Sequence, residues 1–436
     1  MDSVRKANTS FALLVPLVWY AIVASRSISQ WLHPGSIDLT DFNYLEGSPI
    51  DRVVFSILIL VGLLVLTRRK VEWLGVLKRN KWIFLLFLYM LISISWSNFP
   101  EVACKRWIKA AGALVMALIV LTEPESLEAI SRLLRRCFYV HLPLSIILIK
   151  YFRTLGVAWD YTGEAEMWVG VTTHKNVLGQ VVMTSGICFV WDIIRNWGSK
   201  RIILVDFFFL SMALWLLKGS DTSSSATSTI VFLFGIVIML ALRFAKIDLE
   251  NVRRYTLIGV ALAAFLFLVL QFLLEAFTQG SLASLVAGAS GRDPTFTGRR
   301  DLWDDILKIA SHHSILGVGY GSFWIGDLAN DLWNKYHWRP QQGHNGYLDV
   351  YVELGLIGIF LLIVAILCAY KNIMKTFATN LEYARFRMVF LTTLLLHNYT
   401  ESSFLRGTHN LWFLLLLVAV DVPEIYHDKS GYSKRQ

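Results

Sequence analysis

The apolar residues of this chain fall in long blocks that are separated by short charged stretches. The blocks are roughly 16–22 residues long, close to the about 20 residues that a helix needs to cross a bilayer core. Two of them depart from the rest, because 387–397 is short and 171–191 begins with polar residues. The pattern predicts an all-α polytopic membrane protein with about 12 transmembrane helices, at 11–28, 50–67, 82–97, 102–122, 137–152, 171–191, 202–217, 226–245, 255–275, 346–370, 387–397 and 409–423.

One segment between the blocks is much longer than the others, at residues 276–345. Within it Leu302, Ile306 and Ile309 recur at i, i+4 and i+7, which predicts a short amphipathic helix. Loops of this length in compact proteins are usually functional. We therefore divide the chain into transmembrane helices 1–9 (1–275), a large loop that contains short helices (276–345), and transmembrane helices 10–12 with a tail (346–436).

Composition supports the membrane assignment. Of 436 residues 55% are hydrophobic and 17% charged, and the mean hydropathy is +0.53, whereas soluble domains have roughly 45–50% apolar and about 25% charged residues. These values exclude a cytosolic enzyme, a nucleic-acid-binding domain and a disordered protein. The four cysteines are scattered singly, so we expect neither a disulfide framework nor a zinc site.

The net charge is +9, and most of the positive charge lies in short loops between the apolar blocks. It therefore indicates how the chain is oriented in the membrane and does not indicate a nucleic-acid partner. Lys and Arg concentrate in the segments 68–81, 131–136 and 195–201, while the opposite loops 98–101 and 218–225 are nearly free of them. The positive-inside rule then places both termini in the cytoplasm and residues 276–345 on the outer, periplasmic side. Lys105, Arg106 and Lys109 lie near an outer end and depart from this trend.

The boundary QGHNGYLDVYVELGLIG (342–358) holds the most informative polar group. His344 and Asn345 stand where the long loop enters a membrane helix, and Asn345, Asp349 and Glu353 follow one helical stripe. Acidic residues within a span are costly and usually face a polar cavity or a partner. The structural alternative is a polar helix start in which both acids are hydrogen-bond partners.

Three further polar groups fall on the same predicted face of the membrane. TGRRDLW (297–303) carries Arg299 and Arg300, and arginine suits bidentate phosphate binding, although on the sequence alone a solvated helix start is the preferred explanation of the pair. The other two groups are VTTHKNVLGQ (171–180), with His174, Lys175 and Asn176, and HNYTESSFLRGTHN (397–410), with Glu401 and Arg406. Lysine snorkelling would account for the lysine at the helix entrance. No HExxH pattern or tight His and carboxylate cluster is present, so we expect no metal site.

Together these segments resemble the superfamily of O-antigen polymerases (Wzy) and O-antigen ligases (WaaL), and in particular its branch of exopolysaccharide polymerases (ExoQ-like). The matching segments occur in the family's order, and with the long late loop they extend the resemblance over nearly the whole chain. They are THKNVLG at 173–179, TGRRDLW at 297–303, GVGYGSF at 317–323, GHNGYLDVYVELGLIG at 343–358 and NYTESSF at 398–404.

The resemblance implies a metal-independent, GT-C-like glycosyltransferase of the bacterial inner membrane without a cofactor. Its donor would be a glycan on undecaprenyl diphosphate, and its acceptor a polysaccharide or lipid A–core. Arg299 matches the arginine thought to hold the donor diphosphate, and His344 matches the proposed base, with Glu401 or His174 as the alternatives. Ligases carry a second arginine where this chain has KGSDTSSSATS (218–228), so the second phosphate contact is left to Lys175, Lys218, Arg300 or Arg406.

Two other readings remain open. A polysaccharide or lipid-linked glycan transporter would also have many spans with intramembrane charges, but transporters are usually built from paired repeats, whereas this chain is asymmetric. A ligase would differ from a polymerase mainly in its acceptor. Expected partners are membrane lipids and, on the resemblance, a chain-length regulator and a flippase of the same pathway.

Overall fold

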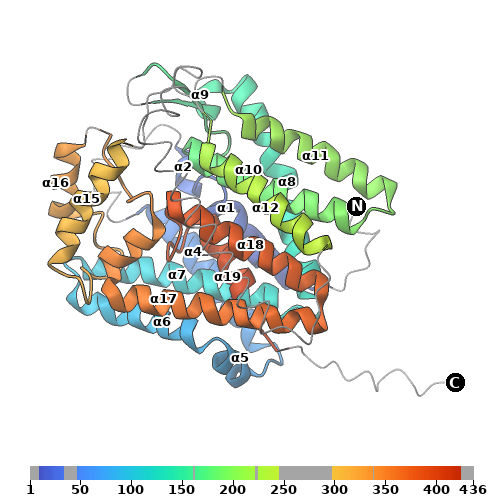
Figure 1. The fold of residues 1–436 in the computed structure, drawn as a ribbon, viewed down its shortest axis with the longest axis horizontal. Coiled ribbons are helices and arrows are strands. Elements are labelled where there is room, and N and C mark those ends of the chain that lie inside the picture. Colours follow the sequence, from blue (N-terminus) through green and yellow to red (C-terminus); the bar gives the residue numbers. More distant parts are fainter. Residues whose placement is uncertain are drawn as a thin grey trace.

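Helices make up most of the chain and follow the apolar blocks closely (Figure 1). The structure is a computed structural model that describes residues 9–33, 47–160, 163–220, 224–244, 297–336 and 338–423, apart from the side chains of Arg201, Thr297 and Arg300. The predicted span at 255–275 and the beginning of the long loop lie outside these residues. The helices in the first half are η2 (Phe11–Leu13), α1 (Leu14–Val23), α2 (Ile28–Leu32), α4 (Pro49–Thr67), α5 (Trp73–Arg79), α6 (Lys81–Ile92), η3 (Ser93–Trp96), α7 (Pro100–Leu121), α8 (Ser126–Tyr151), α9 (Arg153–Gly156) and α10 (Lys175–Arg195).

The helices that follow are α11 (Lys200–Lys218), α12 (Ala226–Phe244), α15 (Thr297–Ser311), α16 (Gly326–Lys335), α17 (Gly346–Thr379), α18 (Leu381–Thr400) and α19 (Asn410–Ala419). Two short strands, β1 (Val157–Trp159) and β2 (Glu166–Trp168), form an antiparallel hairpin that the hydropathy pattern did not predict. Three-residue strands are too short to show an alternation of apolar and polar residues.

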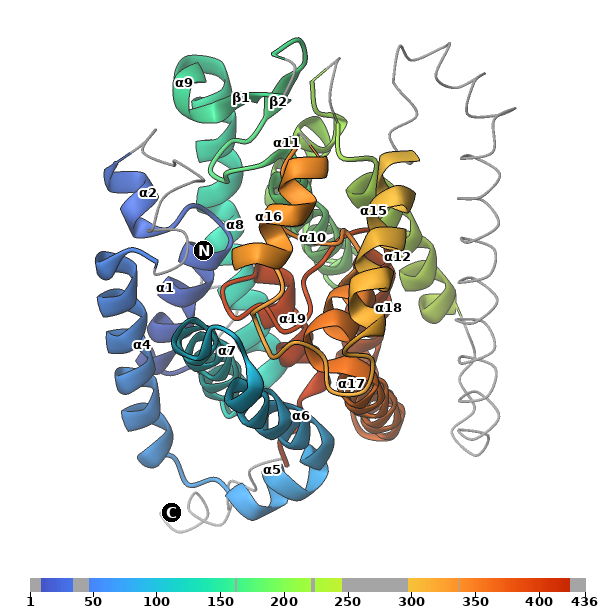
Figure 2. The same cartoon turned by 90° about the vertical axis from the view of Figure 1, so that its left-hand side faces the viewer.

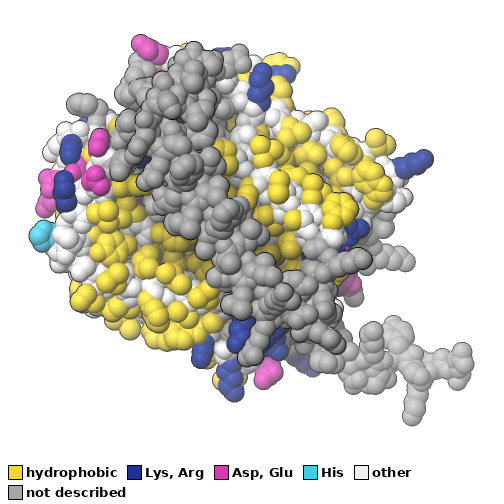
Figure 3. Space-filling view, viewed as in Figure 1, with side chains coloured by type: hydrophobic (Ala, Val, Ile, Leu, Met, Phe, Trp, Pro, Cys, Tyr) yellow, Lys and Arg dark blue, Asp and Glu magenta, His cyan; other side chains and the backbone are white. Residues whose placement is uncertain are grey.

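Several helices have the length and composition of membrane spans. Within the described residues four qualify, namely α4, α10, α12 and α17, and α7 with α8 gives a fifth if this pair, bent by 119°, counts as one. Apolar side chains of α4, α12 and α17 are exposed along the helices, and Figure 3 shows apolar atoms covering much of one face, with charged side chains near its edges. The prediction of an all-α membrane protein is therefore confirmed, while the number of twelve spans and the membrane topology remain predictions.

The helix α8 begins eleven residues before its predicted span of 137–152. The segment 123–136 was assigned to a loop because of its charges, but Leu127, Ile130 and Leu134 are buried at helical spacing. Its basic residues occupy the other faces of the same helix. The charges therefore hid an amphipathic pattern, and the helix extends well beyond the predicted span.

The predicted span at 346–370 is also not one continuous helix. Gly355, within α17, has a φ of 65°, which interrupts the helical backbone. The freed backbone groups bond to the segment before α16, because Leu356 N donates to Ser314 O at 2.9 Å and Gly319 N donates to Glu353 O at 2.9 Å. The GVGYGSF segment is thereby held against the first turns of α17.

The described part of the long loop contains α15 and α16, at one end of the helix bundle (Figures 1 and 2). Leu302 and Ile306 are fully buried and Ile309 packs beside them, which confirms the predicted amphipathic helix. These side chains form a small second core with Phe323 and Trp324. The described part of the loop is thus packed over that end of the bundle.

Candidate active site

The carboxylate of Glu401 joins four segments that are far apart in the sequence. Its Oε1 atom accepts hydrogen bonds from Asn176 Nδ2 at 2.7 Å and from an Arg299 guanidinium nitrogen at 3.4 Å. Its Oε2 atom accepts from Gln342 Nε2 at 3.0 Å and lies 3.1 Å from His344 Nδ1. We refer to these five residues as the Glu401 cluster. The side chain of Glu401 is only 2% exposed, so the carboxylate is held almost out of contact with solvent.

Helix ends position these groups. His174 is the N-cap of α10, and its Nδ1 accepts from Asn176 N, which places Asn176 in the first turn. Asn345 is the N-cap of α17 and accepts from the backbone of Tyr347 and Leu348. Capping side chains satisfy backbone donors that a helix leaves unpaired. The polar residues of both motifs therefore have a structural role as well as a place next to the cluster.

The backbone of His344 is in an unusual conformation. Its φ is 48°, in the left-handed region that only a few per cent of non-glycine residues adopt. Such conformations persist where the surrounding structure imposes them, and they are common at functional sites. The ring lies 5.7 Å from that of Trp338, and its Nδ1 faces Glu401. A carboxylate accepts a hydrogen bond from Nδ1–H and so favours the tautomer with its proton on Nδ1, which leaves Nε2 as the acceptor nitrogen of a neutral imidazole.

Glu401 itself is poorly suited to act as a base. Burial raises the pKa of its carboxyl, but the hydrogen bond from His344 and the charges of His344, Arg299 and His397 outweigh burial and hold the pKa at about 2. A general base works best with a pKa near the working pH. The geometry thus favours His344 as the base and Glu401 as the group that orients it, in the manner of the carboxylate in a serine protease triad.

Arg299 lies at the same cluster. Its guanidinium donates to Thr400 O at 2.9 Å as well as to Glu401, and its side chain is 23% exposed. The pairing of the loop arginine with the last helices brings together two motifs that are about 100 residues apart in sequence. This contact fixes the position of α15 next to His344.

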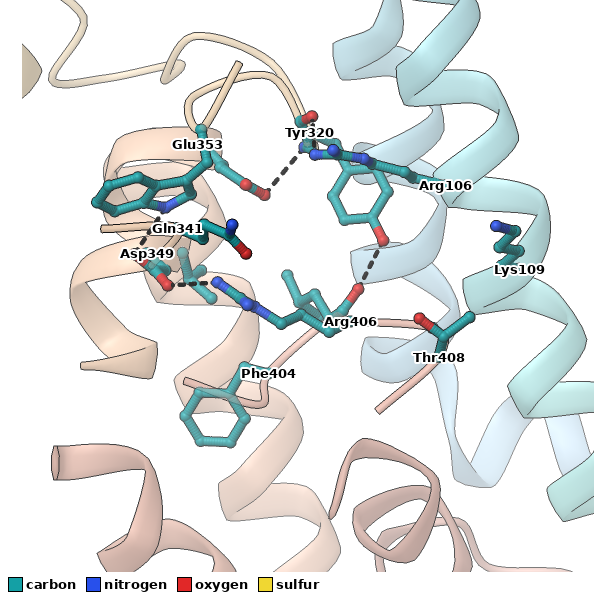
Figure 4. Close-up of a pocket in the computed structure, with 14 residues that line it drawn as sticks. Arg106, Lys109, Tyr320, Gln341, Asp349, Glu353, Phe404, Arg406 and Thr408 are labelled. Carbon is teal, nitrogen blue, oxygen red and sulfur yellow. Dashed lines mark hydrogen bonds and ion pairs between the residues drawn. The ribbon is translucent and has the colours of Figure 1, made fainter. Parts of the chain in front are cut away.

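Asp349 and Glu353 lie outside this cluster, on the wall of a neighbouring cavity of about 260 Å³ (Figure 4). We call this cavity the basic pocket. Its lining includes Tyr320 and Gln341 and three cationic side chains, those of Arg106, Lys109 and Arg406. Figure 4 shows Gln341 and Arg406 on the side of α17, and Arg106 and Lys109 on the side of α7.

Asp349 links the pocket to the Glu401 cluster. It pairs with Arg406 at 2.9 Å, and its other oxygen accepts from Trp324 Nε1 at 3.1 Å and from Gly343 N at 2.9 Å. Since Gly343 directly precedes His344, Asp349 holds the backbone that presents the imidazole. Asp349 therefore fixes the backbone next to His344.

Two glycines permit the close packing around the pocket. A Cβ atom on Gly407 would lie 2.3 Å from Ala110 N, so the loop after α18 rests directly on the α7 backbone. Gly321 has a φ of 65°, and a Cβ there would lie 2.8 Å from Arg106 Cδ. Both approaches bring the late loops against α7.

The structure groups many of the predicted site residues, but not all of them. His344, Arg299, Asn176 and Glu401 meet, with His174 next to them, whereas Arg406, Asp349 and Glu353 line the basic pocket. Lys175 is the first residue of α10, and Lys218 ends α11 with an exposed side chain. The side chain of Arg300 lies outside the described residues.

The sequence reasoning missed Gln342, Arg106 and Lys109 as site residues. No signal in the sequence marks Gln342. Arg106 and Lys109 were visible as exceptions to the positive-inside trend, and an exception near the face that carries every polar motif would have identified them. Within the described parts of the chain no three His, Cys, Asp or Glu side chains are grouped as metal ligands would be, and a metal-independent reaction stays a prediction.

Comparison with known proteins supports the resemblance. The family model described as O-antigen ligase matches residues 207–363, a range that includes Arg299 and His344. The chain is also similar to the exopolysaccharide production protein ExoQ of Rhizobium meliloti (strain 1021), with 26% identity over 355 residues that cover 79% of this chain and 73% of that protein.

Proposed function

Because the chain resembles the O-antigen polymerase and ligase superfamily on its ExoQ-like side, we propose that it is a glycosyltransferase that polymerises polysaccharide repeat units. The donor is a glycan on undecaprenyl diphosphate, the acceptor is a hydroxyl of a second glycan, and the reaction takes place at the periplasmic face of the bacterial inner membrane. The observation that carries the proposal is the contact of His344 Nδ1 with Glu401, next to Arg299.

The residues divide the chemistry between them. His344 Nε2 takes the proton of the acceptor hydroxyl while the hydroxyl oxygen attacks the anomeric carbon of the donor sugar. The bond from that carbon to the diphosphate oxygen breaks, and the carrier diphosphate leaves with the electron pair. Glu401 stabilises the imidazolium that forms, and Arg299 stabilises the charge that develops on the diphosphate.

The ligase remains the second candidate, because the matching family model is described as O-antigen ligase. In a ligase the same residues would direct the glycan to lipid A–core. A deletion strain distinguishes the two reactions. Single repeat units without long polymer indicate a polymerase, and polymer that stays on the carrier with bare lipid A–core indicates a ligase.

The experiment that tests the active site is polymer formation by a His344→Asn variant in the deletion strain. Asparagine tolerates the left-handed backbone and can hydrogen-bond to Glu401, but it cannot serve as a base. We expect the rate to fall by roughly 10²–10⁴-fold at unchanged protein level. Near-normal polymer from this variant would remove His344 from the mechanism.

A further inference from the structure

Two of the cations in the basic pocket lie near a carboxylate but form no ion pair within the described residues. Arg406 is paired with Asp349, and Glu353 accepts from Gly321 N at 2.9 Å. Arg106 donates to a carbonyl, Gly321 O, at 2.6 Å, and the amine of Lys109 lies 5.7 Å from the centre of the Phe55 ring. In the part of the chain that the structure describes, neither Arg106 nor Lys109 forms an ion pair. The wall of the cavity therefore carries an excess of positive charge.

Two cationic side chains on a helix of a membrane protein carry a free-energy cost of desolvation. Arg106 and Lys109 are three residues apart on α7 and both line the same cavity. Charged side chains at a membrane helix usually face a polar cavity and serve a function. Lys105, the neighbouring lysine of the same helix, does not line the cavity. The cavity is therefore lined by the two cations on one side of α7, and not by every basic residue of this segment.

One short segment contributes side chains both to the basic pocket and to the Glu401 cluster. Gln341 lines the pocket, while the side chains of Gln342 and His344 bind Glu401. A group bound in the pocket would therefore contact Gln341, which precedes His344 by three residues in the chain. In the proposed function Arg299 serves the donor diphosphate at the Glu401 cluster, which leaves the pocket for the other substrate.

We propose that the basic pocket is an acceptor subsite that binds an anionic group of the acceptor glycan, a carboxylate or a phosphate on a sugar residue. This inference rests on the proposed function, because that function supplies the acceptor. The volume of about 260 Å³ is below the range of about 300–1,000 Å³ for drug-sized ligands, as suits a single sugar residue. Arg106 and Lys109 bind the anionic group, and the Gln341 amide is available to a sugar hydroxyl.

Binding to the full-length purified protein tests the subsite directly. The probes are glucuronate, glucose 6-phosphate, glucose and inorganic pyrophosphate, measured by saturation-transfer NMR titration. We expect one or both acidic sugars to bind at least tenfold more tightly than glucose, and which of them binds identifies the anionic group. Because hydrogen bonds to charged groups are the strong ones, Arg106→Gln with Lys109→Gln should weaken that binding by at least about tenfold.

Matched variants keep the result interpretable. Lys105→Gln removes a charge from the same helix and should leave binding unchanged, and Arg106→Lys keeps the charge and reports on folding. Wild-type affinity for the acidic sugars in the double variant would overturn the proposal. So would pyrophosphate binding that is lost with Arg106→Gln and kept with Arg299→Gln, because the cavity would then be a diphosphate site.

The transfer reaction separates this inference from the proposed function. Loss of the pocket cations should raise KM for an acidic acceptor with little change in kcat, whereas His344→Asn should lower kcat and leave glucuronate binding intact. If His344→Asn retains full activity, the proposed mechanism fails while the binding titration still decides the subsite. If kcat falls in the pocket variants with KM unchanged, the subsite fails and the mechanism stands.

Discussion

Replacing Glu401 with glutamine tests the idea that a carboxylate orients the imidazole. A glutamine has one oxygen and one amide nitrogen, so it can no longer accept four hydrogen bonds. The oxygen will stay with the cationic Arg299 and with Asn176, and the amide nitrogen will then face Gln342 and His344. An amide N–H that points at Nδ1 favours the tautomer with its proton on Nε2, which cannot accept the proton of a hydroxyl.

The expected loss follows from the role of a general base. Its removal costs roughly 10²–10⁴-fold in rate, or about 2.7–5.4 kcal/mol in the activation free energy, so Glu401→Gln should reduce polymer formation within that range. The free energy of unfolding should fall by about 2 kcal/mol, because hydrogen bonds to charged groups are worth roughly 1.5–3 kcal/mol. The assay is single-turnover transfer from a lipid-linked donor, with thermal unfolding of the same samples.

A double variant gives the decisive result. Residues that act as one unit show losses that do not add, so Glu401→Gln with His344→Asn should be no slower than His344→Asn alone. Losses that multiply would show that the two residues act independently. Wild-type activity of Glu401→Gln would refute the reasoning altogether.

Acid gives an independent check on the same contact. The folded pKa of Glu401 is lowered to about 2 from an ordinary value of 4.5. A lowered pKa means that the carboxylate stabilises the fold above its ordinary pKa and that this stability is lost as the pH falls toward 2. The difference in Tm between wild type and Glu401→Gln should therefore narrow between about pH 4.5 and pH 2. A constant difference over that interval would contradict the ionised contact.

Three other predictions follow from the site and its topology. Arg299→Lys should lose most activity because lysine lacks the planar fork, and Arg300→Lys should be milder because adjacent helical side chains point about 100° apart; equal tolerance in complementation would exclude the loop from donor binding. A chelator should leave the transfer rate of the purified protein unchanged, and activity that returns only with added divalent metal would contradict this. A periplasm-dependent reporter fused after Ser311 should be active, and cytoplasmic activity there would overturn the topology.

The parts of this structure that depend on local sequence were predictable, and those that depend on distant contacts were not. Apolar blocks predicted most helices because each helix buries or exposes its own residues. The break at Gly355 was missed because it depends on hydrogen bonds from residues 314–319, which hydropathy cannot show. The early start of α8 was missed because its charges hid a buried apolar stripe.

The site divides in the same way. His344 and Arg299 were found through motifs that resemble a known superfamily. The central position of Glu401 could not be predicted, because it arises only when the ends of α10, α15 and α18 meet. Arg106 and Lys109 were recognised only as charge exceptions, since no local pattern joins α7 to the loop after α18.

The order of the cluster residues along the chain has a consequence for biosynthesis. A ribosome releases the chain from its N-terminus, so Asn176, Arg299 and His344 all leave it before the carboxylate that binds them does. Until α18 and the loop after it have been inserted, these three side chains lack the carboxylate that joins them. A chain that stops before residue 401 would contain most of the helices but would lack the carboxylate at the centre of the Glu401 cluster.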